Sequence, residues 1–202
     1  MPTDVTSERI VQVALGLFLH QGVKKTNLAE VAFQAGVTRV TVYRYYGDKK
    51  GLVQAVCSRI AAVFRRAAEE GPAGSIRDID ARLNRLGLEL SRFPKGNLLA
   101  RLDEISRLYP DVYEEFRAAK QAAIDTLFEQ ALTAAQCDGS LREGLNMETV
   151  KAIFWNAVVG LIENPALIAS NVPLPEIFAT VTEVFRHGIL KSTVGEQAHG
   201  LR

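Results

Sequence analysis

The chain has 202 residues, of which 48% are hydrophobic and 23% are charged, and its formal net charge is +1. This length allows one or two domains with a substantial core, and 15 Gly and 7 Pro are too few for a disordered chain. The longest apolar stretch, residues 152–162, is too short to span a bilayer, and the polar residues between positions 3 and 9 do not predict a signal peptide. We therefore expect a cytoplasmic protein without a membrane partner.

Residues that carry out catalysis or bind metals are few and scattered. The two cysteines, Cys57 and Cys137, form no C-x-x-C pair and predict neither a disulfide framework nor a zinc site. The three histidines lie far apart, and we find no metalloprotease, nucleophile-elbow, P-loop or dinucleotide-binding motif. We predict that the protein is not an enzyme and holds no cofactor and no metal.

The charges are unevenly distributed. Residues 1–50 contain seven Lys and Arg against four Asp and Glu, a balance of +3, and the remainder carries −2. A basic segment on a slightly acidic body is typical of a module that binds a polyanion.

Hydrophobic residues near the N-terminus repeat with helical spacing. The spacing of residues 10–18 predicts a helix with one buried face, which Ser7 or Thr6 can cap and which Gly22 can end after Gln21. A second helix is predicted over 28–35, with Asn27 as its N-cap and Glu30 completing a capping box.

A tight turn at Gly36 leads to the next two predicted helices. Thr38 caps a third helix that runs to about residue 46, and Asp48 caps a fourth at 48–70.

The remainder of the chain is also predicted to be helical. The clearest linker is 71–75, Gly-Pro-Ala-Gly-Ser. Five further helices are expected at about 76–92, 97–107, 111–136, 147–163 and 174–190, followed by a frayed tail from Ser192. Because no segment alternates apolar and polar residues, the predicted fold is all-α with about nine helices.

Residues 27–46 have the pattern of a helix-turn-helix, two short helices joined by a turn that contains glycine. The residues that can lock the helices together are Val31, Ala32, Val37 and Val42. The second helix would expose the hydrogen-bonding side chains of Arg39, Thr41, Tyr43, Arg44 and Tyr45. Thr38 and Lys49 stand at helix N-termini, which favour a phosphate. The alternative is that the tyrosines are core residues and Arg44 a solvated charge.

This region resembles the DNA-binding domain of TetR-type transcriptional regulators. The resemblance is carried by Leu28-Ala29-Glu30-Val31-Ala32, Ala35-Gly36-Val37-Thr38, Val42-Tyr43-Arg44-Tyr45-Tyr46, Lys49 and Leu52. It covers roughly the first 60 residues. We accordingly expect a helix-turn-helix DNA-binding domain at 1–50 and a helical effector-binding and dimerisation domain at 51–202, connected by helix 48–70.

The resemblance implies a homodimer whose third helix enters the major groove at one half of a palindromic operator on double-stranded DNA. By position, Arg39 and Thr41 would read bases. Phosphate contacts would come from Tyr43, Arg44, Tyr45 and Lys49, with further contacts from Asn27 and Thr38 at helix starts.

Three residues depart from the family's pattern. Val40 replaces a residue that is usually small or Pro, and its side chain either contacts a thymine methyl or packs. Tyr46 replaces the usual Phe and adds a hydroxyl that needs a partner. Gly51 stands where a Glu commonly closes a capping box, which predicts a less firm start of the fourth helix.

The eighth and ninth predicted helices, 147–163 and 174–190, are rich in hydrophobic residues. In the resembling family these helices pair with their symmetry mates, so we expect a homodimer through them. The alternative is that 147–163 is the central helix of a monomeric bundle.

An effector pocket is expected among the fifth to eighth helices. Its candidate lining residues are Leu86, Leu90, Arg101, Leu102, Tyr113, Phe116, Trp155 and Asn156. Their apolar bias favours a hydrophobic or aromatic small molecule. The alternative is that they are ordinary core or surface residues, with Arg101 in an ion pair to Asp103 or Glu104.

These features predict a ligand-responsive transcriptional regulator, with repression the commoner mode in the resembling family. A small, largely apolar effector would tilt helix 48–70 and release the operator. The alternative is a helical dimeric adaptor without sequence-specific DNA binding.

Overall fold

The computed structural model describes residues 5–71, 73–94, 96–162, 164–170 and 172–190. Within these ranges the chain forms ten helices and no strand, apart from an isolated bridge between Leu141 and Leu190, so the predicted all-α fold is confirmed. None of the described helices has the length and apolarity needed to cross a membrane. The helices are α1 (Val5–Gln21), α2 (Leu28–Gln34), α3 (Arg39–Tyr46), α4 (Lys49–Ala68), α5 (Ile76–Ser91), α6 (Leu98–Leu108), α7 (Pro110–Cys137), α8 (Met147–Ile162), α9 (Pro165–Ser170) and α10 (Leu174–Ile189).

The described residues contain one helix more than the nine predicted. The sequence predicts only a connection between the helices at 147–163 and 174–190, but the structure has the short helix α9 there. Proline suits the first position of a helix because its missing N–H is not needed there. The Asn164 side chain accepts a hydrogen bond from the Ala166 N–H at 2.9 Å and so caps this turn. The predicted tail from Ser192 lies outside the described residues.

The predicted caps of α2, α3 and α4 are confirmed, whereas the predicted cap of α1 is wrong because Thr6 and Ser7 lie within that helix. Side-chain oxygens of Asn27, Thr38 and Asp48 accept hydrogen bonds from the third residue of α2, α3 and α4, at 2.9, 3.1 and 2.8 Å. The Glu30 carboxylate accepts a hydrogen bond from Gln21 Nε2 at 2.7 Å, so its partner is α1 rather than the expected Asn27 N–H. Local sequence therefore sets where each of these short helices begins.

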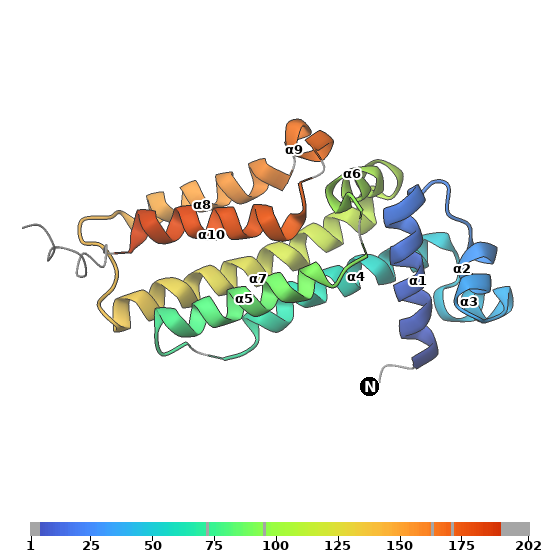
Figure 1. Cartoon of the computed structure of the whole chain (residues 1–202), viewed down its shortest axis with the longest axis horizontal. Coiled ribbons are helices and arrows are strands. Elements are labelled where there is room, and N and C mark those ends of the chain that lie inside the picture. The colour runs from blue at the N-terminus through green and yellow to red at the C-terminus, as the bar shows by residue number, and fades with distance from the viewer. Residues whose placement is uncertain (1–4, 72, 95, 163, 171, 191–202) are drawn as a thin grey trace, which may run out of the picture.

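The helices form a small head, α1–α3 (residues 5–46), and a longer body, α5–α10 (residues 76–189), which α4 connects (Figure 1). In the body α7, with 28 residues, runs alongside α4. α10 packs against α5 and α8, and α6 lies at the end of the body nearest the head. The long axis of the molecule therefore follows α4 and α7.

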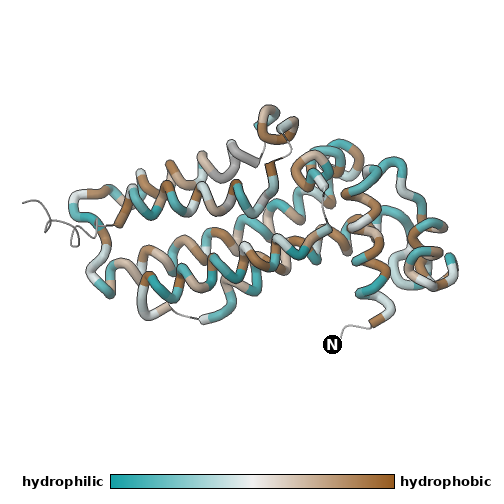
Figure 2. Tube along the Cα trace, in the orientation of Figure 1, coloured by the Kyte–Doolittle hydropathy of each residue, from teal (hydrophilic) through white to brown (hydrophobic). Residues whose placement is uncertain are grey.

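One buried cluster connects the head to the body. It includes Ile10 of α1, Leu52 and Ile60 of α4, and Leu127 of α7. α4 alone contributes ten buried residues. Hydrophobic positions recur along all the helices that contribute to this cluster (Figure 2). Because α4 is buried at both of its ends, it is part of the core of the head and of the body.

Aromatic residues attach α8 and α10 to α7. The Phe154 ring stacks on Phe128 with centroids 4.3 Å apart and meets Phe185 edge-on at 5.0 Å. Trp155 Nε1 donates a hydrogen bond to Asp125 Oδ1 at 2.7 Å. Offset and edge-on ring pairs of this kind are favourable beyond the area they bury.

Candidate nucleic-acid interface

Buried aliphatic residues hold α2 and α3 together. Val31, Ala32 and Val42 are buried, and Val37 of the turn packs against the same cluster, as the sequence predicts. Gly36 adopts a φ of +61°, in the left-handed region that favours glycine. This packing leaves the opposite side of α3 in solvent.

The exposed side of α3 carries a pre-arranged set of polar side chains. Arg39 Nη2 donates a hydrogen bond to Tyr43 Oη at 2.9 Å, and its guanidinium lies 5.3 Å from the centre of the Tyr43 ring. The hydroxyl oxygens of Thr38 and Thr41 are 2.9 Å apart. These contacts restrict the rotamers of Arg39 and Thr41, so less conformational entropy is lost when they bind a partner.

The three tyrosines of α3 have different environments. Tyr43 is exposed, whereas Tyr45 and Tyr46 are half-buried and pack against the core cluster. Tyr46 Oη donates a hydrogen bond to the Ser7 carbonyl at 2.8 Å, which supplies the partner that its hydroxyl needs. The Arg44 guanidinium lies 5.5 Å from the Tyr45 ring centre. The alternative that the tyrosines are core residues therefore holds in part for Tyr45 and Tyr46, which are half-buried, and does not hold for Tyr43.

Lys49 points toward the loop between α1 and α2. Its Nζ donates a hydrogen bond to the Lys24 carbonyl at 3.1 Å. Burial lowers the pKa of Lys49 below its usual value, although the nearby Glu104 carboxylate acts in the opposite direction. Lys49 therefore binds the loop as well as lying at the start of α4.

Two hydrophobic side chains of the head are largely exposed. Val40, at the second position of α3, is 76% exposed, so the alternative that it packs does not hold. Phe33 of α2 is also exposed. The sequence does not predict the exposure of Phe33, because an aromatic residue next to a buried alanine in a short helix is usually expected to be buried as well.

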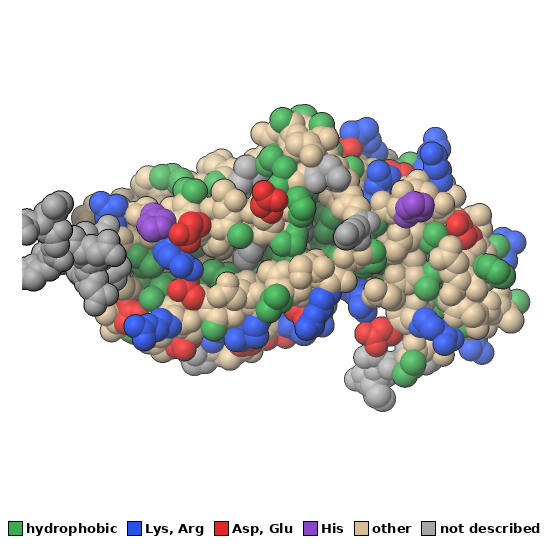
Figure 3. All heavy atoms as spheres, in the orientation of Figure 1, with side chains coloured by type: hydrophobic (Ala, Val, Ile, Leu, Met, Phe, Trp, Pro, Cys, Tyr) green, Lys and Arg blue, Asp and Glu red, His purple; other side chains and the backbone are tan. Residues whose placement is uncertain are grey.

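Basic side chains lie along the outer edge of the head, and basic and acidic side chains alternate on the visible face of the body (Figure 3). Several acidic groups of the body are paired: Lys50 with Asp111 at 2.5 Å, Arg107 with Asp103 at 2.6 Å and Arg117 with Glu114 at 2.6 Å. The head itself, residues 5–46, contains five Lys and Arg against two Glu, whereas Lys50 at the start of α4 is paired with the body.

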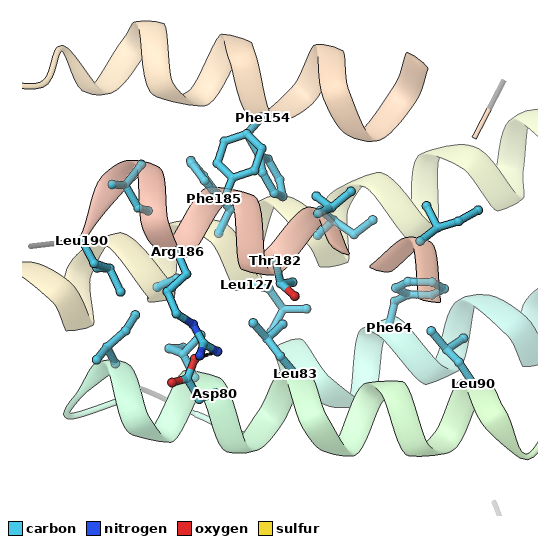
Figure 4. Close-up of a pocket in the computed structure, with 18 residues that line it drawn as sticks. Phe64, Asp80, Leu83, Leu90, Leu127, Phe154, Thr182, Phe185, Arg186 and Leu190 are labelled. Atoms are coloured by element: carbon cyan, nitrogen blue, oxygen red, sulfur yellow. Dashed lines mark hydrogen bonds and ion pairs between the residues drawn. The ribbon is translucent and has the colours of Figure 1, made fainter. Parts of the chain in front are cut away.

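A cavity of about 130 Å³ lies between α4, α5, α7, α8 and α10 (Figure 4). A cavity of this size can hold a single aromatic ring. All of its lining residues are hydrophobic except Asp80, Thr182 and Arg186. Arg186 and Asp80 form an ion pair of 2.7 Å that joins α10 to α5, on the opposite side from Phe154 and Phe185. The cavity is therefore apolar, with charged groups at one side.

Only Leu90 of the eight predicted pocket residues lines this cavity. The other seven lie elsewhere: Leu86, Leu102 and Phe116 in the buried core, Tyr113 and Trp155 half-buried, Asn156 exposed, and Arg101 paired with Glu104 at 2.8 Å. The cavity instead includes Phe64 of α4 and Phe185 of α10. Periodicity identifies these residues as buried, but it does not show which helices leave space between them.

Comparisons relate the chain to known proteins. Residues 10–56 match the family described as bacterial regulatory proteins, tetR family. An uncharacterized HTH-type transcriptional regulator of Mycobacterium bovis, Mb2274c, is 32% identical over 142 residues, which cover 69% of this chain and 71% of that protein. SmeT, the repressor of the Stenotrophomonas maltophilia multidrug efflux pump SmeDEF, has a TM-score of 0.60 at 22% identity, over 96% of this chain and 94% of that chain. A SmeT–triclosan complex has a TM-score of 0.62 at 20% identity, over 98% of each chain.

The junction between α3 and α4 provides a test of the packing beneath the exposed face. A Cβ at position 51 would overlap the backbone carbonyl of Tyr46, whereas a Cβ at Gly87 within α5 meets nothing within 4 Å. We expect Gly51→Ala to lower the free energy of unfolding by about 1–3 kcal/mol because the backbone must shift. Gly87→Ala is expected to raise it by about 0.5–1 kcal/mol, since Ala favours the helix. Urea denaturation measures both, and a stabilising Gly51→Ala would contradict the close approach.

Proposed function

Because the chain belongs to the TetR family of bacterial transcriptional regulators, we propose that it is a repressor that binds a palindromic operator as a homodimer and is released by a small, largely apolar effector. DNA binding and transcriptional regulation are properties of the family, and the chain is not an enzyme. The observation that carries the finer proposal is the exposed side of α3, with Arg39 held against Tyr43.

We propose a division of labour among the residues of the interface. Arg39 and Thr41 read base edges in the major groove, and Val40 contacts a thymine methyl, because it is exposed between them. The phosphate contacts come from Asn27, Thr38, Tyr43, Arg44, Tyr45 and Lys49. Thr38 is suited to this because free N–H groups and the positive end of the dipole meet at the start of α3. Phosphate contacts fix the register, and base contacts supply the specificity.

The proposed DNA-binding domain comprises residues 1–50, and the effector-binding and dimerisation domain comprises residues 51–202. α4 is the lever between them. It begins at Lys49 directly after the recognition helix, and its Phe64 lines the cavity. A change in the cavity therefore has a direct route to the head.

The proposed dimer interface is formed by α8 and α10. Ile153 and Val184 project from these two helices and are 57% and 65% exposed. Large apolar side chains exposed on neighbouring helices are typical of a covered surface. A two-fold dimer also matches the symmetry of a palindrome. The alternative of a monomeric bundle would leave both side chains in water.

The cavity is the proposed effector site. Its hydrophobic lining favours an apolar or aromatic molecule, and the Arg186–Asp80 pair offers polar contacts at one side. The complex of SmeT with triclosan shows that a protein of the same fold binds a small aromatic molecule. An effector releases the operator only if it binds the two positions of α4 with different affinity.

Arg39 and Arg44 allow a matched test of the division of labour, since both are exposed arginines of α3. Arg39→Ala is expected to cost about 1–3 kcal/mol and to relax specificity at one operator position. Arg44→Ala should weaken all sequences nearly equally and lower the salt slope by about one. Competition with operators changed at single positions measures both, and identical profiles would contradict the assignment.

Val184 and Leu88 test the dimer interface. Both are exposed hydrophobic residues, but Val184 lies on α10 and Leu88 on α5. We expect Val184→Glu to convert the protein to monomers at micromolar concentration, because a charge in an apolar interface loses its hydration. Leu88→Glu should leave the dimer intact. Sedimentation velocity measures the mass, and a dimeric Val184→Glu protein would place the interface elsewhere.

The proposed function as a whole is tested by selection of bound sequences from a random duplex pool at physiological salt. We expect recovery of a palindrome with half-sites one helical turn, or a multiple of it, apart. The Arg39→Ala/Arg44→Ala protein is the control and should recover none. If the folded, dimeric wild-type protein also recovers none, it is either the adaptor without sequence-specific binding or a protein purified with its effector bound, and extraction of the purified protein for a small molecule distinguishes the two.

A further inference from the structure

The loop between α1 and α2 is bound by a carboxylate of the body. Glu104 of α6 accepts a hydrogen bond from the Val23 N–H at 3.0 Å through one oxygen, and from the Lys24 N–H at 2.8 Å through the other. Arg101, one turn earlier on α6, donates to the same carboxylate at 2.8 Å. Two consecutive backbone N–H groups of the head are thus held by one side chain.

The same loop is bound from its other side by α4. The Lys24 carbonyl accepts the hydrogen bond from Lys49 Nζ, while the Lys24 N–H donates to Glu104. One residue of the loop is therefore attached to both α4 and α6. Hydrogen bonds have preferred directions, so this arrangement fixes the orientation of the loop as well as its distance.

Gly22 makes this close approach possible. Its φ is +96°, and a Cβ at this position would lie 2.6 Å from Arg101 Nη1 and 3.2 Å from a Glu104 oxygen. Any other residue would therefore be strained by its backbone conformation and would also displace the ion pair. The glycine that ends α1 is the residue that lets the loop reach α6.

The charge of Glu104 suits it to this role. Burial raises its pKa, but the N–H groups of Lys24 and Val23 and the guanidinium of Arg101 outweigh burial and hold the pKa below its usual value. The carboxylate is therefore ionised at neutral pH. Hydrogen bonds to an ionised acceptor are stronger than those between neutral groups.

α6 is itself anchored to the body at its other end. Asn97 caps α6 by accepting from the Ala100 N–H at 2.9 Å, and its Nδ2 donates to the Ile168 carbonyl of α9. The helix that holds the loop is thereby attached to a segment adjoining α8 and α10.

We propose that Glu104 is a positioning residue for DNA recognition, which joins the head to α6 and fixes its orientation about α4. The apolar contacts between the head and α4 are not directional. The directional contacts of α4 with the head come from Arg59, which bonds Glu8 and Gln12, and from Lys49, and Glu104 adds a second point of attachment on α6. In the dimer that orientation sets the distance between the two recognition helices, and with it the half-site spacing that the protein accepts. The inference rests on the proposed function.

Hydrogen exchange tests the attachment without DNA. In Glu104→Gln one acceptor oxygen is replaced by an NH₂ group that cannot accept, so one of the Val23 and Lys24 amides loses its acceptor, and its exchange is expected to accelerate by about tenfold or more. Glu114→Gln is the matched control, because Glu114 pairs with Arg117 on the surface of α7. Unchanged exchange in Glu104→Gln would overturn the proposal.

Spacing preference then tests positioning. Operators are compared with half-sites at the selected spacing and one base pair closer or farther apart. Wild-type protein and Glu114→Gln should prefer the selected spacing by roughly tenfold, and Glu104→Gln by about threefold or less. Equal weakening at all spacings, with the preference retained, would show a merely structural role and overturn the proposal. A wild-type protein that binds no palindrome would contradict the proposed function. The exchange measurement is made without DNA, so its result does not depend on that function.

Discussion

The architecture depends on the burial of α4 along its whole length. Leu52 near its start, and Ile60 and Phe64 farther along, lie in one buried cluster with residues of the head and of the body. Because interiors are close-packed, a helix held in this way cannot shift at one end without displacing neighbours at the other. The absence of a Cβ at Gly51 brings the start of α4 against the carbonyl of Tyr46, so the recognition helix lies directly on this element. α4 thus connects the helices of the head with the cavity of the body, which is why we propose it as the lever between them.

The recognition surface is made from helices that would not be stable alone. Seven- and eight-residue helices are marginal in water, and here α2 and α3 persist because side chains cap their first turns and Val31 and Val42 bury their inner faces. The outer face is then free to carry polar groups that contribute little to stability. The contact of Arg39 with Tyr43 on this face arranges the side chain before any partner arrives. Stability and recognition are therefore served by different sides of the same short helix.

Two kinds of contact join the head to the body. The contacts along α4 are mainly apolar, with hydrogen bonds from Arg59 to Glu8 and Gln12 of α1, whereas Glu104 binds two backbone N–H groups of the loop from α6. In our proposals an effector in the cavity moves α4, while the Glu104 contacts hold the loop of the head to α6. Movement of α4 then changes the orientation of the head relative to the body. The Arg186–Asp80 pair lies far from this joint, at the side of the cavity, where it connects α10 to α5.

The sequence by itself determined nine of the ten described helices, the caps of α2, α3 and α4, the locking residues of the helix-turn-helix and the family, because these depend on spacings of three to eight residues. The positive charge of the head follows from a count of its residues, and the exposed polar side of α3 follows from the same local periodicity. Only the tertiary structure decided the cavity lining, the contact of Tyr46 with Ser7 and the ion pair of Arg186 with Asp80. These join residues tens of positions apart on separate helices, and periodicity shows which side of a helix is buried without showing what that side meets.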